Sequence, residues 1–476
     1  MINLDEIRSV AARVALTNTV VEKDYALGWL IWGIHQHPIA AQDWVFKGGT
    51  CLKKCYFETY RFSEDLDFSY RGSDQPTVES LTQIMSEVSD FVMNEAGLEF
   101  PKASIQFEIF KNPRGSLSIQ GGIKYRGPVR PQVGLQQMQR IKIDLTLDEP
   151  LVLLPVIKSF DHSYSDKPEN GISILSYDYE EVFAEKVRAL AQRLRPRDLY
   201  DVIHLHRRMD LKPDRDKVYS TLESKCRLRG IDIPTMASLE THDNRAFLES
   251  EWENQLKHQI PVLPDFQSFL VELPDVLNWL EGEETEELES VGGQDDTEVH
   301  DEEVARLVAP GPTTSYMDRI RFAAASRLLV RLGYDGSTRD IEPYALARSS
   351  DGNLLLQSIR HQDGESRSYR FDRIESVQVL EQTFTPRYTI EITSAGYLPV
   401  HQLTRTSAAP RVRTSMRPAR PVRRSAQSTG PTYIYRCGVC QKKFRKKSMD
   451  YHLNAHKNKS GYPCAGRTGI FLRTKY

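Results

Sequence analysis

One segment of the sequence cannot take part in a hydrophobic core, and it divides the chain. Residues 281–303 read EGEETEELESVGGQDDTEVHDEE and hold 12 acidic residues with no Lys or Arg. Like charges repel, and the segment has too few apolar side chains to offset the entropy that folding costs. Since 476 residues leave room for about two to four domains of roughly 100 to 200 residues, we expect folded parts on both sides of it.

A second linker is expected closer to the C-terminus, where the composition changes again. Residues 401–431 contain seven Arg among Ser, Thr, Ala and Pro, without apolar periodicity. Two linkers predict three folded parts. The expected boundaries are a first block at 1–280, an acidic linker at 281–315, a small β domain at 316–400, a basic linker at 401–431 and a C-terminal module at 432–476.

The formal charge of -2 hides a separation of charge along the chain. Residues 401–476 hold 18 Lys+Arg and a single acid, Asp450, so this region is strongly basic. Such asymmetry indicates an anionic partner, most simply nucleic acid. The alternative is a solvated basic tail that binds nothing specific or folds back on the acidic part of the chain.

Three features predict a cytoplasmic protein without membrane contact. The N-terminus carries Asp5 and Glu6 and has no basic segment before an apolar one, so no signal peptide is expected. No stretch approaches the ~18 uninterrupted apolar residues that a membrane helix needs. Of the six cysteines, only Cys437, Cys440 and Cys464 cluster at ligand-like spacing, which suits a reducing compartment.

Apolar periodicity predicts alternating helices and strands in the first block. The expected helices cover 4–16, 19–35, 178–194, 197–208 and 265–280, and the expected strands cover 44–46, 66–70, 105–110 and 141–147. The middle part differs, because short strand-like runs alternate there with turn signals. These runs are 341–347, 353–360, 367–372, 376–381 and 387–393. We therefore expect a mixed α/β block followed by a small β barrel or sandwich.

A glycine turn is the first chemical signal in the block. Gly48, Gly49 and Thr50 follow an apolar strand and precede a helix in FKGGTCLKK. Glycine lets the backbone approach a ligand closely, and the N–H groups of a helix start can face a phosphate. By itself the turn is a weak signal for a nucleotide site.

Alternating acids on two expected strands strengthen that signal. Asp65 and Asp67 point to one face of their strand, about 6.5 to 7 Å apart at the backbone. Asp144 lies on the polar face of RIKIDLTLDEP and becomes a third carboxylate if the two strands are neighbours. Such carboxylates can share Mg²⁺, which prefers oxygen ligands. A solvated strand face is the structural alternative for each of them.

A lysine in an apolar helix stripe adds a candidate cation. Lys186 lies four residues from both Val182 and Leu190, where it either extends to the edge of the core or meets an anion in a cleft. In the next expected helix, Asp198 and Asp201 share one face at i, i+3. An ion pair between Lys186 and one of these acids is the structural alternative.

Five segments occur in the order and approximate spacing of a known family. They are VEKDYAL (21–27), FKGGTCLKK (46–54), RFSEDLDF (61–68), EEVFAEKVRAL (180–190) and RPRDLYDV (195–202). With them, about the first 210 to 280 residues resemble the AbiEii/AbiGii nucleotidyltransferase toxins of the wider DNA polymerase-β-like superfamily. The resemblance implies a mixed sheet with flanking helices and a helical subdomain, binding a nucleoside triphosphate with Mg²⁺.

Carried over by position, the resemblance implies a role for each candidate residue. Gly48, Gly49, Thr50 and Ser63 would hold the triphosphate; Asp65, Asp67 and, by strand pattern alone, Asp144 would bind Mg²⁺; Lys186 would contact phosphate; and Asp201 would complete the catalytic set, with Arg197 and Asp198 beside it. The implied reaction is an in-line displacement at the α-phosphate, with pyrophosphate as the leaving group.

The acceptor of the nucleotide is left open by the sequence. The family implies a tRNA-like nucleic acid or a protein, and the basic tail favours a nucleic acid. A toxin or phage-defence role implies a cognate antitoxin or other defence proteins as partners. The rival hypothesis is a nucleic-acid-binding regulator whose first block binds a nucleotide without catalysis.

In residues 332–388, Arg339 precedes Ile341-Glu342-Pro343-Tyr344, Arg367 precedes Tyr369-Arg370-Phe371, and Asp372-Arg373-Ile374 follows. With these features the segment resembles a WYL domain, a small Sm-like β-barrel. In this chain Leu354-Leu355-Leu356 replaces the Trp-Tyr-Leu triplet. The resemblance makes Arg339, Arg367 and Arg373 candidate ligands for nucleic acid or a nucleotide signal. In the alternative interpretation these arginines pair with Glu342, Asp372 and Glu375.

The last part of the chain has the spacing of a zinc site. Cys437-x2-Cys440 is followed by His452 and His456, with eleven residues between Cys440 and His452 rather than about twelve. Cys464 offers a second set, which we prefer because Cys464 otherwise has no role. The preferred ligands are Cys437, Cys440, His456 and Cys464, with His452 as the alternative fourth ligand. Ordinary buried cysteines are the remaining alternative, and so small a module would need its metal to fold.

Overall fold

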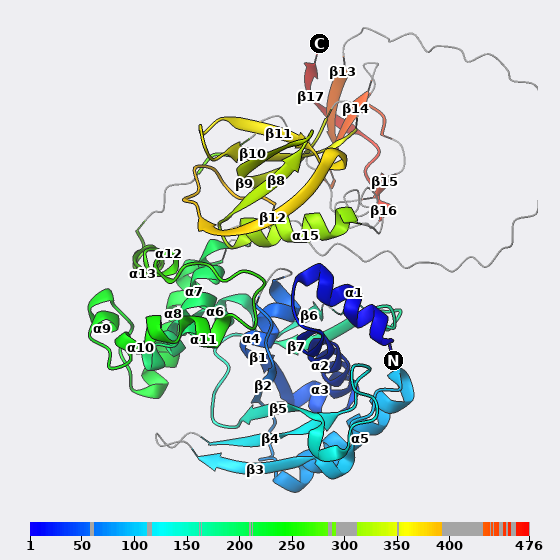
Figure 1. The fold of residues 1–476 in the computed structure, drawn as a ribbon, viewed down its shortest axis with the longest axis vertical. Helices are drawn as coiled ribbons and strands as arrows, with labels where there is room; N and C mark the ends of the chain where they lie inside the picture. The colour runs from blue at the N-terminus through cyan, green and yellow to red at the C-terminus, as the bar shows by residue number, and fades with distance from the viewer. Residues whose placement is uncertain are drawn as a thin grey trace, which may run out of the picture. The chain divides into compact units, whose positions relative to one another are not determined.

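The computed structural model describes residues 1–57, 61–111, 117–160, 162, 164–208, 211, 213–283, 288–291, 312–349, 352–392, 432–437, 439–440, 442–446, 451–453, 456–457 and 463–475. It divides into two compact units, Met1–Leu403 and Thr404–Tyr476, whose ribbon is drawn in Figure 1. The expected basic linker 401–431 lies outside the described residues, as do residues 284–287 and 292–311 of the expected acidic linker.

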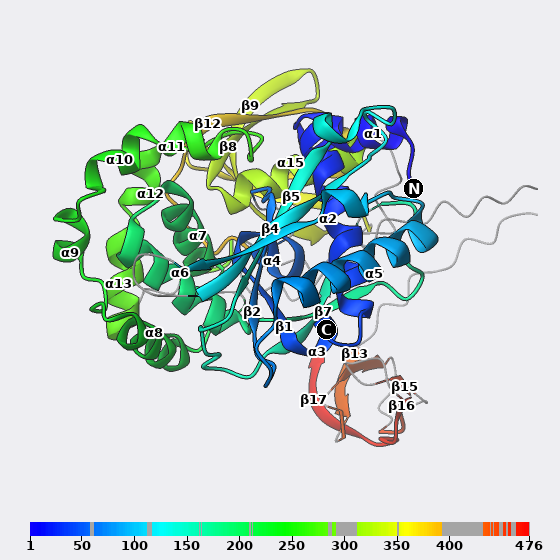
Figure 2. The ribbon, with the colours of Figure 1, turned by 90° about the horizontal axis from the view of Figure 1, so that it is seen from below.

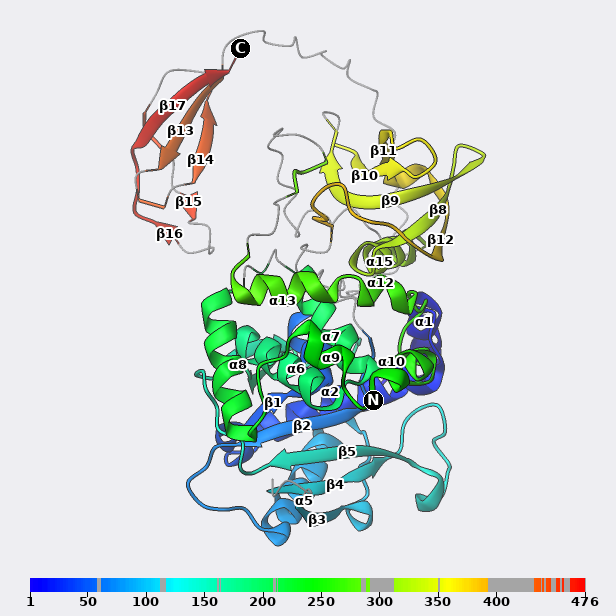
Figure 3. The ribbon, with the colours of Figure 1, turned by 90° about the vertical axis from the view of Figure 1, so that its left-hand side faces the viewer.

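A seven-stranded mixed sheet forms the centre of the first block. Its strands are β1 (Trp44–Lys47), β2 (Asp65–Tyr70), β3 (Gln106–Lys111), β4 (Leu117–Tyr125), β5 (Gln139–Thr146), β6 (Val156–Phe160) and β7 (Ile172–Ser176). They follow the order β3-β4-β5-β2-β1-β7-β6, part of which can be traced in Figure 3. The pairs β1–β7 and β2–β5 are parallel, and the other pairs are antiparallel.

The first helices bury one face of this sheet. They are α1 (Leu4–Val14), α2 (Asn18–Gln36), α3 (Ala40–Asp43) and α5 (Val78–Ala96). Local signals fix their ends: Thr17 caps α2 by accepting from the Val20 N–H, and Gly97 ends α5 with a φ of 64°. Apolar residues of α1, α2 and α5 share one buried core with β1, β2, β4 and β5.

A second group of helices, drawn in green in Figure 2, lies apart from α2 and α5. Its members are α6 (Tyr179–Arg193), α7 (Pro196–Arg207), α8 (Arg215–Arg229), α9 (Met236–Glu240), α10 (Arg245–Ser250), α11 (Trp252–Leu256), α12 (Phe266–Leu270) and α13 (Leu273–Glu281). Asp178 caps α6, and Pro196 opens α7, where its missing N–H costs no hydrogen bond. The expected α/β block with a helical subdomain is therefore present.

The middle part is a helix, α15 (Pro312–Ala325), followed by an antiparallel sheet. The strands are β8 (Leu328–Tyr334), β9 (Ser337–Arg348), β10 (Leu354–Arg360), β11 (Ser366–Arg370) and β12 (Ile374–Thr383), in the order β11-β10-β9-β8-β12. Asp335 and Gly336, with φ values of 48° and 69°, connect β8 to β9 in the conformation that tight hairpins favour. Among the described residues the sheet is open, so closure into an Sm-like barrel is not confirmed.

The described residues of the second unit form five short strands. They are β13 (Thr432–Cys437), β14 (Lys443–Lys446), β15 (His456–Lys457), β16 (Pro463–Cys464) and β17 (Gly469–Lys475). One sheet has the order β14-β13-β17, and β15 pairs with β16 in another. Within the described residues, no helix has both the length and the apolar character that crossing a membrane requires.

Two expected elements were wrong. The helix expected at 265–280 is two helices, α12 and α13, because Pro274 begins a new helix and cannot continue the old one. The strand expected at 387–393 is not found in its described residues, where Thr389 makes only an isolated bridge to Ser290. The sequence interpretation also missed β4, β6, β7 and β8 and the helices α3, α5, α8, α9, α10, α11 and α15.

A buried ion cluster joins the helical subdomain to the β domain. Glu272 accepts two hydrogen bonds from Arg207, at 2.8 and 3.1 Å, and lies 2.8 Å from a guanidinium nitrogen of Arg327. Burial alone would raise the pKa of Glu272, but Arg207 and Arg327 outweigh it and hold that pKa below its ordinary value. The two arginines therefore depend on one carboxylate for their partner.

Replacing Glu272 with Ala should lower the free energy of unfolding by about 3 kcal/mol, because it leaves the buried Arg207 guanidinium and the partly buried Arg327 guanidinium without their carboxylate. Chemical denaturation followed by circular dichroism measures this. The matched control is Glu253→Ala, which removes an exposed i, i+4 pair with Lys257 and should cost less than about 1 kcal/mol. Equal losses in the two variants would contradict the structural role of Glu272.

Candidate active site

The glycine turn stands directly against the acidic strand. Gly48 has a φ of +81°, and a Cβ built there would lie 2.2 Å from Asp67 Oδ2, so only glycine fits. The Thr50 hydroxyl donates to the Asp65 carbonyl oxygen at 2.5 Å. A Cβ at Gly49 would lie 3.1 Å from Ser63 Oγ. The structure thus brings Gly48, Gly49, Thr50 and Ser63, four of the six expected nucleotide-binding residues, to the start of β2.

The expected acids meet at neighbouring strands. Asp67 is in register with Asp144 on the parallel strand β5, and Asp65 precedes it on the same face of β2. Gln120 on β4 donates to Asp144 Oδ2 at 2.6 Å, whereas Asp144 Oδ1 is buried and has no hydrogen-bond partner among the described residues. Burial, reinforced by the charge of Asp67, raises the pKa of Asp144 to about 6.

Lys47 at the end of β1 faces these carboxylates. It is in register with Asp67, donates to Thr146 Oγ1 at 3.1 Å and forms a buried ion pair with Glu149. Burial raises the pKa of Asp67, and the charge of Lys47 opposes this increase most strongly. The sequence interpretation missed Lys47 and Glu149, although Lys47 directly precedes the glycine turn.

Lys186 and Asp201 form the ion pair that the sequence offered as an alternative. Lys186 Nζ lies 2.8 Å from Asp201 Oδ2. Arg61 binds the same carboxylate through two nitrogens, at 2.7 and 2.8 Å. Burial alone would raise the pKa of Asp201, but Arg61 and Lys186 outweigh it and hold that pKa below its ordinary value. Asp201 therefore anchors Lys186 and Arg61, and its geometry does not require a metal.

The other two candidates on α7 also have protein partners. Asp198 is fully buried and accepts two hydrogen bonds from Arg193, at 2.6 and 2.7 Å. Arg197 donates to the carbonyl oxygen of Gln255 at 3.3 Å. The carboxylate of Asp198 thus orients Arg193, a cation that the sequence interpretation did not select.

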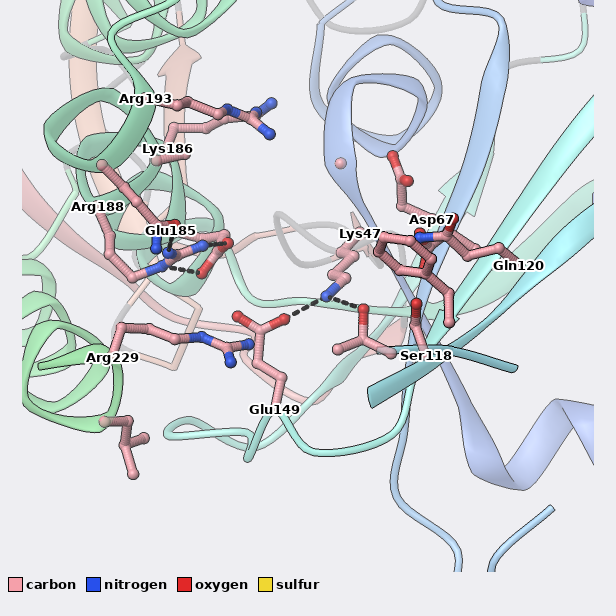
Figure 4. A pocket seen from close by; sticks show the side chains of 17 residues that line it. Lys47, Asp67, Ser118, Gln120, Glu149, Glu185, Lys186, Arg188, Arg193 and Arg229 are labelled. Carbon is pink, nitrogen blue, oxygen red and sulfur yellow. Dashed lines mark hydrogen bonds and ion pairs between the residues drawn. The ribbon is translucent and has the colours of Figure 1, made fainter. Parts of the chain in front are cut away.

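One cavity of about 350 Å³ is lined by four of the predicted site residues, namely Gly48, Asp67, Asp144 and Lys186, whereas Asp65 and Asp201 are not among its lining residues. Its strand wall includes Asp67 and Asp144, and its helix wall includes Lys186, Arg193 and, from α8, Arg229. Figure 4 shows Lys186 and Arg193 across the opening from Asp67. The two walls therefore present opposite charges to one space.

The cations of the helix wall differ in how they are held. Arg188 pairs with Glu185 of the same helix and donates to Gln192 at 2.7 Å. Arg193 is paired with Asp198. Arg229 has no ion pair with any residue that the structure describes. Its position at the end of α8 gave no sequence signal, because the packing of α8 beside α6 brings it to the cavity.

Among the residues that the structure describes, the three arginines of the β domain do not form the ion pairs that the alternative interpretation named. Arg339 donates to the Tyr334 carbonyl oxygen at 2.8 Å and lies over the rings of Tyr334 and Tyr369. Arg367 pairs with Glu365. Arg373 is exposed in the short turn between β11 and β12. They are not gathered into one site by any contact among the described residues.

In the second unit, four donors converge. The ligand atoms of Cys437, Cys440, His456 and Cys464 all lie within 4.8 Å of one another. His452, the alternative ligand, forms an isolated bridge with Thr468 and is outside this group. The structure thus assembles the set that the sequence interpretation preferred.

Comparisons with known proteins agree with the resemblance seen in the sequence. The family described as nucleotidyl transferase AbiEii toxin, type IV TA system, matches residues 34–281, and the WYL domain matches residues 315–379. Among solved structures, the MenT4 nucleotidyltransferase toxin from Mycobacterium tuberculosis is similar, with 19% identity and a TM-score of 0.39. That match covers 60% of this chain and 91% of the other. Among curated proteins there is no match.

The two family matches follow the two folded parts of the first unit. The first covers the mixed sheet with its helical subdomain, and the second covers most of the antiparallel sheet. Because the first match spans more than half of the 476 residues, this chain belongs to the AbiEii nucleotidyltransferase toxins and is a nucleotidyltransferase that also carries a WYL domain.

Proposed function

We propose that the protein transfers a nucleotide from a nucleoside triphosphate to a nucleic acid acceptor, in a Mg²⁺-dependent reaction within the cavity between β2, β5 and α6. The single observation that carries this proposal is the opposition of the two walls. The strand carboxylates Asp67 and Asp144 and the helix cations Lys186, Arg193 and Arg229 lie around one space of about 350 Å³. A triphosphate with bound Mg²⁺ would suit such a cavity, because the carboxylates would bind the cation and the basic side chains would bind the phosphates.

The strand wall has the chemistry of a Mg²⁺ site. Asp67 and Asp144 provide hard oxygen donors from adjacent strands, and Asp65 adds a third on the same face. The buried Oδ1 of Asp144, with no hydrogen-bond partner among the described residues, fits a cation ligand. A bound Mg²⁺ would supply charge neutralisation at the reacting phosphate.

The helix wall would receive the phosphates. Asp201 holds the Lys186 ammonium in place, and Asp198 holds the Arg193 guanidinium, so both cations are oriented before a ligand arrives. Gly48 lets the backbone pass close to the same region. In this arrangement the protein positions the triphosphate, an acceptor hydroxyl attacks the α-phosphate, and pyrophosphate leaves. One of the strand carboxylates takes the proton of the hydroxyl.

The acceptor is assigned from charge. The 18 Lys+Arg and single acid of residues 401–476 favour a polyanion over a protein as the partner. We propose that the acceptor is a tRNA-like RNA. We also propose that the protein acts in the cytoplasm as a toxin or phage-defence enzyme with a cognate antitoxin. The arginines of the WYL domain, Arg339, Arg367 and Arg373, would sense nucleic acid or a nucleotide signal.

The rival hypothesis is a nucleic-acid-binding regulator whose first block does not catalyse transfer. The double variant Asp65→Ala, Asp67→Ala separates the two, and we expect it to transfer labelled nucleotide at least about 100-fold more slowly than the unaltered protein, because several kcal/mol of metal-dependent stabilisation are lost. Each labelled triphosphate is incubated with cellular RNA and with cellular protein. Asp216→Ala, which changes an exposed carboxylate on α8, should retain full activity.

Undiminished labelling by the double variant would contradict the assigned metal site. Salt-dependent RNA binding without any covalent product, in the unaltered protein as well, would favour the regulator. Label recovered in protein rather than RNA would contradict the proposed acceptor while leaving the transfer reaction intact.

Replacing Arg229 with Ala should raise the KM for the triphosphate about tenfold and leave kcat within about twofold, since a charged hydrogen bond to phosphate is removed. The matched control is Arg227→Ala, two residues away on α8, where the arginine is exposed and paired with Glu223. Steady-state kinetics at saturating acceptor provide both parameters. A similar rise in KM for both variants would exclude a specific contact at Arg229.

The raised pKa of Asp144 predicts how stability depends on pH in the absence of metal. The folded protein holds this proton more tightly than the unfolded chain, so stability falls as the pH rises from about 4 to about 6 and is then constant. In EDTA, Asp144→Asn should therefore be more stable than the unaltered protein at pH 8, by about 1 to 3 kcal/mol, and similar to it at pH 4.

Chemical denaturation across this pH range measures the difference, with Asp216→Asn as the control. Adding Mg²⁺ at pH 8 should stabilise the unaltered protein and not the Asp144→Asn variant. A Mg²⁺ effect of equal size in both proteins would show that Asp144 is not a ligand.

A further inference from the structure

The strongest group of chemical donors outside the cavity lies in the second unit. Cys437 and Cys440 come from the end of β13 and the turn after it, whereas His456 and Cys464 face each other across the β15–β16 pair. All four ligand atoms lie within 4.8 Å of one another. Neither family match reaches this part of the chain.

The distances within the group are those of a tetrahedral metal site. Cys437 Sγ lies 3.8 Å from Cys464 Sγ, and Cys440 Sγ lies 3.4 Å from His456 Nε2. Zinc with Zn–S bonds of about 2.3 Å and Zn–N bonds of about 2.0 Å would separate two sulfurs by roughly 3.8 Å and a sulfur from a nitrogen by roughly 3.5 Å. A disulfide would require about 2.05 Å between sulfurs.

The backbone around the sulfurs supports thiolates. The Val439 N–H donates to Cys437 Sγ at 3.4 Å, and the Gly466 N–H donates to Cys464 Sγ at 3.3 Å. Hydrogen bonds of this kind orient metal ligands and stabilise their negative charge. A Cβ at Gly466 would lie only 2.3 Å from Cys437 Sγ, so the chain closes tightly around the donors.

The imidazole is also held in place. The ring of Phe444 packs edge-on to His456, with 4.7 Å between ring centroids, and leaves Nε2 directed at Cys440. Among the described residues of the second unit, the buried apolar side chains are Ile434, Tyr435, Cys437, Leu453 and Cys464, and Cys440 and Phe444 are partly buried. So few side chains cannot stabilise a fold alone, whereas a bound metal can.

We propose that Cys437, Cys440, His456 and Cys464 bind one Zn²⁺ as a structural site. Three thiolates and an imidazole suit zinc, and four protein ligands leave no open position for catalysis. The ion joins the end of β13 to the β15–β16 pair and fixes the fold of the second unit. This site is independent of the reaction proposed for the cavity.

Metal analysis of the purified full-length protein, by mass spectrometry, tests this proposal. We expect one zinc per chain in the unaltered protein and less than about 0.2 in Cys464→Ser. Two controls are matched to the alternatives: Cys226→Ser changes a buried cysteine of α8, and His452→Ala removes the other histidine of the module. Both should keep one zinc. The Gly466→Ala variant keeps all four donors but should bind zinc at least tenfold more weakly, because its methyl group meets Cys437 Sγ.

A second measurement does not depend on how the variants fold. Cobalt(II) exchanged into the unaltered protein should give sulfur-to-cobalt absorption in the near ultraviolet and the strong visible bands of a tetrahedral site. Absence of zinc from the unaltered protein, or an octahedral cobalt spectrum, would overturn the proposal. Zinc retained in Cys464→Ser but lost in His452→Ala would overturn this ligand set.

Discussion

The geometry of the active-site region depends on one buried carboxylate. Asp201 is fully buried and binds Arg61, which precedes β2, together with Lys186, which comes from α6. A buried charge without partners costs several kcal/mol, so the three groups have to come together in the folded state. Because they come from separate parts of the block, this cluster fixes the helices relative to the glycine turn and to the acids on the sheet. The cavity lies between the sheet and the helices whose relative positions this cluster fixes.

Several charges around the cavity are paired with other protein groups. On the strand side Glu149 pairs with Lys47, and on the helix side Glu185 pairs with Arg188. Lys225 of α8 links the two sides, because it lies 3.8 Å from Glu149 and 3.5 Å from Glu185. Each wall keeps its sign toward the opening, which is the condition for binding a ligand that carries a metal ion at one end and phosphate at the other.

The sequence predicted features that are local and missed those that packing creates. Alternation in RIKIDLTLDEP correctly indicated a strand with Asp144 on its polar face, and Pro196 marked a helix start. Arg61, Lys47 and Arg229 carry no periodic signal, because their importance comes from the contact of segments far apart in sequence. The spacing of Cys and His along the sequence allowed two sets of zinc ligands, with either His452 or Cys464 as the fourth ligand. In the structure the β15–β16 pair brings Cys464, and not His452, to the other donors. Pro274, by contrast, is a local signal in the sequence that indicates a break between α12 and α13, and the sequence interpretation overlooked it.

The helical subdomain and the β domain share a single apolar core. Residues of α15 and β8, such as Ile320 and Leu328, are buried in the same cluster as Phe269 and Trp279. Two domains that are joined only by a linker can unfold independently, and one of them can be replaced without disturbing the core of the other. Here each domain buries apolar side chains of the other, so the two should unfold in one cooperative step. A truncation at residue 281, where the family match ends, would therefore expose apolar core residues of the toxin domain, such as Phe269 and Trp279, to solvent.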